Sequence, residues 1–279
     1  MVELQSFQDV EKGRHLGPQG GFSVQSHFRS AAPYYLSGRP SYSSLLIRRV
    51  VELCDLNATH KMLDLGSGPG QLAVAFAPFV GEVTALDPEL EMLRVARDNA
   101  TAGHFKIKFV LGSSYDLGPR FGRFQVATIG RAFHWMDRLA TLKLLDSMIE
   151  ADGAVILFDS HPEVSGNSWR ESYQRLLERY AKGDVESQKR RSPEWLRHEA
   201  VLLNSPFHHL EHLSIVERRF TAVERFVDRA LSLSCTSRER LGAKADEMAN
   251  EIQRLMTDHS FEGEVAESVE STALVARRR

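Results

Sequence analysis

The chain has 279 residues and a formal net charge of −2, so it has no overall positive field that would attract a nucleic-acid backbone. Hydrophobic residues make up 42% and charged residues 26%, as in globular proteins, and the length suits one α/β domain with an insertion or two small domains. No apolar run reaches membrane-spanning length, and Cys54 and Cys235 lack metal-type or redox-type spacing, so we expect a cytoplasmic protein without a metal site or a membrane anchor.

Two segments precede the first strand. Residues 1–26 are polar and rich in glycine, which predicts a flexible leader. Residues 28–42 combine aromatic side chains with an Arg-Pro pair, and Ser43 or Ser44 then stands where it can cap a helix with apolar residues at helical spacing.

A glycine-rich turn follows the predicted strand at residues 62–65 and leads into a helix that begins near Gly70. Glycine allows the backbone to pass close to a ligand because it has no Cβ. The next strand, residues 82–86, ends in Asp87, and an acid at that place can accept hydrogen bonds from both hydroxyls of a ribose. These features predict a nucleoside-binding crevice at the carboxyl ends of parallel strands.

The spacing of the turn discriminates between cofactors. A dinucleotide fingerprint needs a third glycine at position 71, where this chain has Gln71, so the pattern argues against a nicotinamide cofactor. Asp64 lies two residues before Gly66, where its charge would repel a pyrophosphate but suits a ligand that carries a cationic amine.

The pattern D-x-G-x-G-x-G from Asp64 to Gly70, with the D-P-x-x-x-M run that begins at Asp87, resembles motif I and the following segment of class I S-adenosylmethionine-dependent methyltransferases. The resemblance implies an α/β fold: a doubly wound, Rossmann-like, seven-stranded sheet with its last strand antiparallel and with helical lid insertions. It also implies S-adenosyl-L-methionine as cofactor and S-adenosyl-L-homocysteine as product. In this family the first acid, here Asp64, orients the methionine end, and Asp87 holds the ribose.

Two further segments resemble one branch of that family. Residues 28–42 are similar to an F-x-x-x-A-x-x-Y-x-x-x-R-P-x-Y segment, and residues 130–137 to an A-x-H-W segment, of the small-molecule branch that includes trans-aconitate and ubiquinone/menaquinone C-methyltransferases. The resemblance implies that Arg39 lies near the methionine carboxylate; a surface Arg-Pro turn is the alternative. The residues expected to bind the cofactor are Tyr35, Arg39, Asp64, Gly66, Ser67, Gly68, Asp87, Pro88, Met92, Ser113, Ser114, Tyr115, Gly130 and Arg131.

Within this set, Ser113 departs from the family pattern. Many relatives have an aspartate there that binds the adenine amine, and a serine can still accept that hydrogen bond. The alternative contact is the backbone of Ser114 and Tyr115. Arg131 is open to two interpretations as well, because it could bind an acidic substrate or a backbone carbonyl.

The remaining core elements alternate between short apolar runs and amphipathic helices. We expect strands at 106–111, 124–129 and 154–158 and helices that begin near Pro88 and after an Asp137 cap. Further along, we expect a helix with Trp169, Tyr173 and Tyr180 on one face, a capped helix start at Ser192-Pro193, strands at 212–220 and 264–276, and two helices between them.

These elements predict four segments. Residues 1–26 are the leader, residues 27–160 the cofactor-binding core and residues 161–208 a helical lid. Residues 209–279 complete the core with strands six and seven and carry a helical insertion at 222–257.

His134 is the candidate general base, because its ordinary pKa near 6.5 allows a neutral imidazole at pH 7. The alternative is that His134 bonds the cofactor or the backbone. Trp135, Trp169, Tyr173 and His208 are candidates for the substrate pocket, although the aromatic face could instead be the core of the lid and paired histidines are often surface residues.

A small-molecule acceptor fits the sequence best. No N-P-P-Y or D-P-P-Y follows the fourth strand, and no Pro-Cys pair occurs, so the patterns of nucleic-acid amine and pyrimidine methylation are missing. Attack by oxygen, nitrogen or carbon stays open, as does the oligomeric state, a homodimer included. The alternative function is a protein on the same fold that binds the cofactor without transferring methyl groups.

Overall fold

The computed structural model describes residues 28–162, 168–181, 188 and 192–279. The predicted leader, residues 1–26, lies outside these ranges. None of the helices in the described part of the chain is long and apolar enough to cross a membrane.

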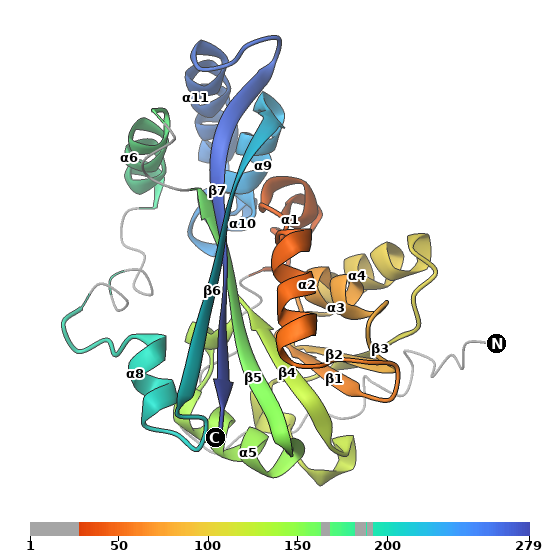
Figure 1. Ribbon diagram of the computed structural model, residues 1–279. Helices are drawn as coiled ribbons and strands as arrows, with labels where there is room; N and C mark the ends of the chain where they lie inside the picture. Colours follow the sequence, from red (N-terminus) through yellow and green to blue (C-terminus); the bar gives the residue numbers. More distant parts are fainter. Residues whose placement is uncertain (1–27, 163–167, 182–187, 189–191) are drawn as a thin grey trace.

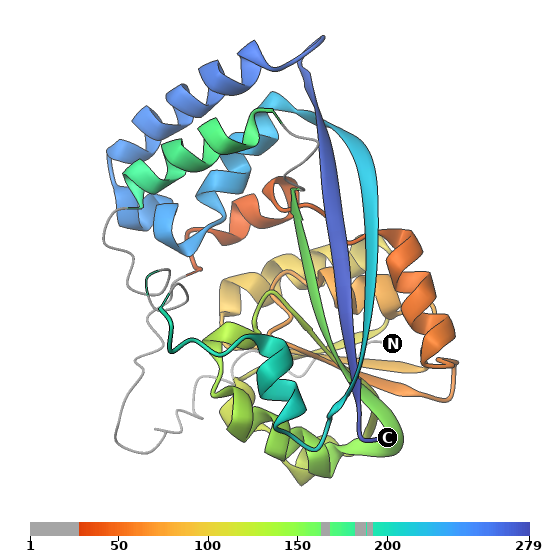
Figure 2. The same cartoon turned by 60° about the vertical axis from the view of Figure 1, so that its left-hand side comes forward.

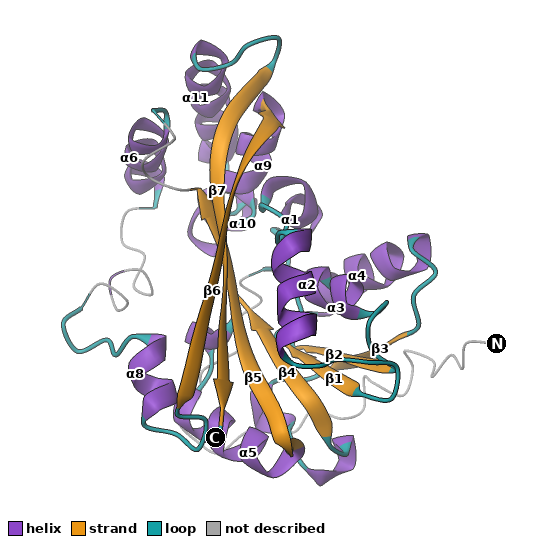
Figure 3. Cartoon of the chain, viewed as in Figure 1, coloured by secondary structure: helices purple, strands orange, loops and turns teal. Residues whose placement is uncertain are grey.

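A seven-stranded sheet forms the centre of the molecule, with the strand order β3-β2-β1-β4-β5-β7-β6 (Figures 1 and 3). Strands β1 to β5 are parallel, and β7 is antiparallel to both of its neighbours. The strands are β1 Lys61–Leu65, β2 Glu82–Asp87, β3 Ile107–Leu111, β4 Phe124–Gly130, β5 Ile149–Pro162, β6 His209–Ala222 and β7 Glu264–Arg277. The predicted fold class is confirmed.

The chain reverses its direction of progress across the sheet between β1 and β4. From β1 it moves outward to β2 and β3, and then returns to place β4 on the other side of β1. At such a switch point the connections leave the two strand ends in opposite directions, which opens a crevice at their carboxyl ends. The glycine turn after β1 and the predicted 130–137 segment after β4 both lie at this edge.

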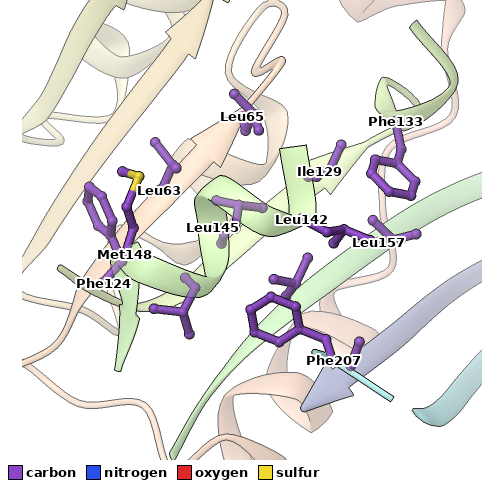
Figure 4. Close-up of a cluster of buried hydrophobic side chains, with 14 of the residues drawn as sticks. Leu63, Leu65, Phe124, Ile129, Phe133, Leu142, Leu145, Met148, Leu157 and Phe207 are labelled. Atoms are coloured by element: carbon purple, nitrogen blue, oxygen red, sulfur yellow. The ribbon is translucent and has the colours of Figure 1, made fainter. Parts of the chain in front are cut away.

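Helices cover both faces of the sheet. One face carries α2 Ser44–Leu53, α3 Gln71–Phe76 and α4 Leu90–Ala102, and the other carries α5 Arg138–Met148 and α8 His198–Leu203. Figure 4 shows the core on the α5 side, where Leu142 and Leu145 pack between β4, β5 and Phe207. The strands have apolar side chains on both faces because both faces are covered.

Two predicted helix caps are confirmed. The Ser43 hydroxyl accepts a hydrogen bond from the Leu46 N–H at 3.4 Å and begins α2. The Asp137 carboxylate accepts one from the Ala140 N–H at 3.1 Å and begins α5. Each cap satisfies one of the backbone donors that a helix start leaves free.

The last three strands are much longer than the others. Strands β5, β6 and β7 have 14 residues each, whereas β1 has five, so they continue past the carboxyl edge of the parallel sheet. Figure 2 shows that the helices at this far end form a group of their own. We call it the helical unit; it consists of α1 Ala32–Gly38, α6 Arg170–Tyr180, α9 Val223–Leu231, α10 Arg238–Leu241 and α11 Lys244–Asp258.

The expected lid at 161–208 is divided between two places. Helix α6 packs with α9 and α11 in the helical unit, whereas α8 packs on the core beside α5 through Val201 and Leu202. The helix start predicted at Ser192-Pro193 is wrong, because α8 begins only at His198. The preceding residues are held against α5 instead: the Arg138 guanidinium lies over the Trp195 ring at 3.9 Å and donates to the Leu196 carbonyl.

Candidate functional site

The glycine turn between β1 and α3 has a left-handed backbone at Gly66, Gly68 and Gly70, with φ values of 67°, 52° and 78°. Only glycine adopts this conformation without strain. A Cβ on Gly66 would lie 2.6 Å from the Ala132 Cβ, whereas one on Gly68 would meet no atom within 4 Å. The turn is therefore packed on the side of the β4–α5 loop and open at Gly68.

Asp64 lies beneath this turn and is 1% exposed. One carboxylate oxygen accepts from the Ala73 N–H at 3.0 Å and the other from the Thr128 hydroxyl at 2.9 Å. Burial raises the pKa of Asp64 to about 7, because desolvation penalises the charged carboxylate more than the two donors stabilise it. Asp64 thus joins α3 and β4 to the turn from within the protein, and it does not project from the open side of the turn.

Asp87 stands at the end of β2, directly beside the open part of the turn. Its oxygens accept from the Gly68 and Glu89 N–H groups, each at 2.8 Å. Burial raises the pKa of this carboxyl to about 6. Each carboxylate oxygen has a second lone pair, so Asp87 can accept two further hydrogen bonds from a ligand.

Ser113 is used differently from the expectation. Its hydroxyl lies 3.0 Å from an Asp116 carboxylate oxygen, to which it donates, and it accepts from the Tyr115 N–H at 3.3 Å. This capping box opens the short 3-10 helix at Ser114–Asp116, so most of the hydrogen-bonding capacity of Ser113 is spent inside the protein. The same contact also engages the Tyr115 N–H, so the Ser113 side chain and the Ser114–Tyr115 backbone both stay predictions as contacts of the adenine.

Two arginines from distant parts of the chain meet at one tyrosine. The guanidinium carbons of Arg39 and Arg131 lie 5.3 and 5.6 Å from the centre of the Tyr35 ring. Arg131 also donates to the Pro40 carbonyl at 3.3 Å and to the Gln71 side chain, and Arg39 donates to the Ser232 carbonyl at 3.5 Å.

Four buried polar atoms have no hydrogen-bond partner among the described residues: the Nε atoms of Arg39 and Arg131, the Ser67 hydroxyl and, on the extension of β5, the Nδ1 atom of His161. An unsatisfied buried polar group costs about 1–3 kcal/mol. Such groups gathered around an open turn indicate a place prepared for a polar ligand.

The backbone is strained where β4 ends. Arg131 has a φ of 54°, which is rare for a residue with a side chain. Its N–H donates to the Phe158 carbonyl at 3.0 Å, and Gly130 leaves room for the Tyr42 hydroxyl, which would lie 2.5 Å from a Cβ there. Strained backbone of this kind collects at functional sites.

Tyr42 and Gln71 were not predicted as site residues. The Arg131 guanidinium carbon lies 4.8 Å from the centre of the Tyr42 ring, whose edge packs on Phe158. Burial raises the pKa of Tyr42 far above its ordinary value, so this hydroxyl stays protonated. The tyrosine that closes the 28–42 segment was the available signal for the first residue, whereas nothing in the sequence pattern links Gln71 to an arginine sixty residues later.

The β4–α5 loop supplies the predicted aromatic residues. His134 is half-buried, and its ring centre lies 5.0 Å from that of Trp135. Trp135 in turn packs edge-to-face on Phe28 at 5.6 Å. The loop and the start of the 28–42 segment therefore lie against each other at the crevice.

Three residues predicted for the substrate pocket lie elsewhere. Trp169 and Tyr173 are buried in the core of the helical unit, where the Tyr173 hydroxyl donates to the Phe226 carbonyl at 2.7 Å. His208 precedes β6, whose first residue pairs with Arg277, and this is the amino edge of the sheet. The expectation fails for Trp169 and Tyr173 because helical periodicity does not separate a core face from a pocket face.

The other predicted residues have unremarkable positions. Met92 is buried in the first turn of α4, and Pro88 is exposed two residues before that helix begins. Within the described ranges no group of three metal-ligating side chains occurs.

Comparison with known proteins agrees with this geometry. Residues 62–153 match the family described as a methyltransferase domain. The chain is therefore similar to methyltransferases from β1 to the first part of β5. Over 114 residues it is 28% identical to an uncharacterized methyltransferase, YcgJ, of Bacillus subtilis; the match covers 40% of this chain and 45% of that protein.

Two other similarities extend the comparison. Malonyl-[acyl-carrier protein] O-methyltransferase of Pseudescherichia vulneris is 35% identical over 95 residues, which cover 34% of this chain and 36% of the relative. The matches thus span less than half the length of these curated relatives. A methyltransferase structure from Thiobacillus denitrificans in complex with S-adenosyl-L-homocysteine shares the fold, with a TM-score of 0.50 and 16% identity over 89% of this chain and 97% of the other.

The residues at this edge fit S-adenosyl-L-methionine on the observations above. The open turn at Gly68 offers a backbone cradle, Asp87 has free lone pairs beside it, and the unpartnered Nε atoms of Arg39 and Arg131 can donate to a carboxylate.

Proposed function

We propose that this protein transfers a methyl group from S-adenosyl-L-methionine to a small molecule. The observation that carries the proposal is the open glycine turn beside Asp87, with two unsatisfied arginine Nε atoms at the same edge. Asp87 would hold the ribose hydroxyls, and Arg39 the methionine carboxylate. When bound, the cofactor supplies a methyl group on a positively charged sulfur.

The protein's contribution to this reaction is chiefly position. Methyl transfer from a sulfonium is an in-line displacement with a good leaving group, so holding donor and acceptor in line supplies much of the rate. The helical unit lies over the carboxyl edge and would exclude water from the crevice. His134 remains our candidate for a general base, needed only where the acceptor must lose a proton.

The acceptor class is inferred at a coarse level. The segments at 28–42 and 130–137 favour the small-molecule branch, and the malonyl-[acyl-carrier protein] enzyme among the relatives is named as an O-methyltransferase. The accepting atom is an oxygen, a nitrogen or a carbon of the small molecule. The net charge of −2 and the free cysteines Cys54 and Cys235 favour a protein of the reducing cytoplasm that does not bind nucleic acid.

Calorimetric titration tests the cofactor assignment. We expect S-adenosyl-L-methionine and S-adenosyl-L-homocysteine to bind the purified protein, and we expect no binding of NAD. Tight binding of NAD alone would overturn the proposal. Release of S-adenosyl-L-homocysteine in the presence of small-molecule acceptors then separates an enzyme from a protein that binds the cofactor without transferring methyl groups.

His134→Ala separates the two interpretations of that residue. If His134 is the base, the variant binds S-adenosyl-L-homocysteine normally but loses turnover. If the cofactor affinity falls instead, His134 belongs to the binding site.

A further inference from the structure

Strand β5 extends past the end of its neighbour β4. Strand β4 ends at Gly130, which pairs with Phe158, and β5 continues to Pro162 while it stays paired with β7. Residues 159–162 are therefore not paired with β4, and the edge of β5 that they leave free borders the crevice.

The alternation of side chains decides what β5 presents there. Leu157 belongs to the core on the α5 side and Phe158 to the core on the α2 side. Asp159 therefore points to the α5 side, which is also the side to which the β4–α5 loop with His134 leads. Asp159 is exposed, and its carboxylate accepts only the N–H of the adjacent Ser160, at 2.8 Å, among the interactions of the described residues.

A second carboxylate on the same face provides a comparison. Glu270 pairs across the strands with His161, lies 3.5 Å from its Nε2 atom, and accepts from the Ser214 hydroxyl at 2.5 Å. The charge of Glu270 is thus engaged by neighbouring side chains, whereas Asp159 faces the crevice without a side-chain partner in the described part of the chain.

Asp159 interacts electrostatically with the two arginines of the site, Arg39 and Arg131. Its negative charge acts on both Arg39 and Arg131 and raises the pKa of each, although burial lowers the pKa of Arg39 overall. A site with two guanidinium groups repels a positively charged ligand unless a carboxylate compensates. The methyl donor of the proposed function carries positive charge on its sulfur and on its amine.

We propose that Asp159 binds a cationic centre in the loaded site. This inference rests on the proposed function, and the centre has two sources: the sulfonium of the methyl donor or an ammonium group of the acceptor. Both groups are compact positive charges, and either would lie beside the extension of β5.

The first arm of the test compares two ligands that differ by one methyl group and one charge. S-adenosyl-L-methionine and S-adenosyl-L-homocysteine are titrated into wild type, Asp159→Asn, Asp159→Glu and the control Asp258→Asn, an exposed aspartate at the far end of α11. If the sulfonium is the centre, Asp159→Asn weakens S-adenosyl-L-methionine about tenfold and S-adenosyl-L-homocysteine less than twofold. Asp159→Glu restores part of the difference.

The second arm uses protein saturated with S-adenosyl-L-homocysteine and titrated with trimethylammonium chloride, with sodium chloride as the matched salt. If an acceptor ammonium is the centre, wild type and Asp258→Asn bind trimethylammonium, and Asp159→Asn loses at least tenfold in affinity. The proposal is overturned if Asp159→Asn changes both cofactor forms equally, or neither, and has no effect on trimethylammonium.

The result also separates this inference from the proposed function. If wild type binds both cofactor forms and Asp159→Asn shows no charge-dependent effect, only the role of Asp159 is overturned. If wild type binds neither form, both are overturned.

Discussion

At the scale of single residues, the site contains two buried carboxyl groups whose surroundings disfavour the charged form. Asp64 and Asp87 have pKa values raised to about 7 and about 6 from the ordinary 3.8. A raised value in the folded state means that the folded protein binds these protons more tightly than the unfolded chain. The contribution of both groups to stability is therefore present at low pH and is lost as the pH rises from about 4 to about 7.

The pH dependence of cofactor binding follows from Asp87. Its carboxylate must be ionised to accept from both ribose hydroxyls, so affinity for S-adenosyl-L-homocysteine should rise with pH through about 6. We expect binding about tenfold weaker at pH 5 than at pH 7, measured by calorimetry. Asp87→Asn should bind weakly at both pH values with a much smaller pH dependence; a variant that keeps wild-type affinity would remove Asp87 from the site.

The two open-turn glycines form a matched pair of substitutions. Gly66→Ala adds a Cβ 2.6 Å from Ala132 on a positive-φ backbone and should lower both the melting temperature and the cofactor affinity. In Gly68→Ala the added Cβ meets no protein atom, so the substitution costs only the backbone strain, about 1 kcal/mol. The cofactor affinity should nevertheless fall, because this Cβ occupies the ligand's side of the turn. Equal melting temperatures for the two variants would contradict the packing described here.

At the scale of elements, a buried ion pair fixes the helical unit to the sheet. Arg229 of α9 donates two hydrogen bonds of 2.9 Å to Glu267 of β7 and a third, at 3.1 Å, to the Gly38 carbonyl at the end of α1. Thr221 donates to the same carboxylate at 2.6 Å. One side chain thus joins the long strand, the insertion helix and the segment that leads to Arg39.

Removal of one member of the ion pair should lower the free energy of unfolding far more than removal of both. Arg229→Met leaves Glu267 buried without its cation, and we expect a loss of about 3–5 kcal/mol in the free energy of unfolding. The double variant Arg229→Met/Glu267→Leu should recover much of this loss. Arg179→Met, which breaks an exposed pair with Glu251, is the control and should change little. Denaturant unfolding measures these variants together with the single variant Glu267→Leu, and a loss in the double variant equal to the sum of the two single losses would refute the coupling.

At the scale of the whole molecule, the long strands bring two parts of the chain over one edge of the sheet. Strand β6 leads into α9 and α11 leads into β7, so these two strands place both helices past the parallel strands, and α1 packs on α9 (Figure 2). Arg39 follows α1 directly, so the helical unit supplies one of the two arginines and the β4–α5 loop supplies the other.

Cofactor binding should therefore order the helical unit as well as the turn. We expect S-adenosyl-L-homocysteine to slow hydrogen exchange in α1 and in residues 66–70, because Arg39 and the turn would contact the same ligand. Residues 209–213, at the amino edge of β6, should be unaffected. Slower exchange in the turn without any change in α1 would show that Arg39 does not contact the ligand.

The sequence by itself determined the elements whose signals are local. Strand β1, its glycine turn and Asp87 could be located because a short apolar run, a turn that needs glycine and an acid at a strand end each leave a mark within a few residues. The caps at Ser43 and Asp137 were predictable for the same reason.

Tertiary structure decided the features that depend on residues far apart in the chain. Trp169 and Tyr173 became core because α9 and α11 cover them, and His208 lies at the opposite edge because β6 runs parallel to β5. Asp159 gained its place at the crevice only because β4 ends earlier than β5. Periodicity shows which side chains share one face of a helix or strand, but it does not show which element packs against that face. The packing element determines whether a side chain lines a site or lies in a core.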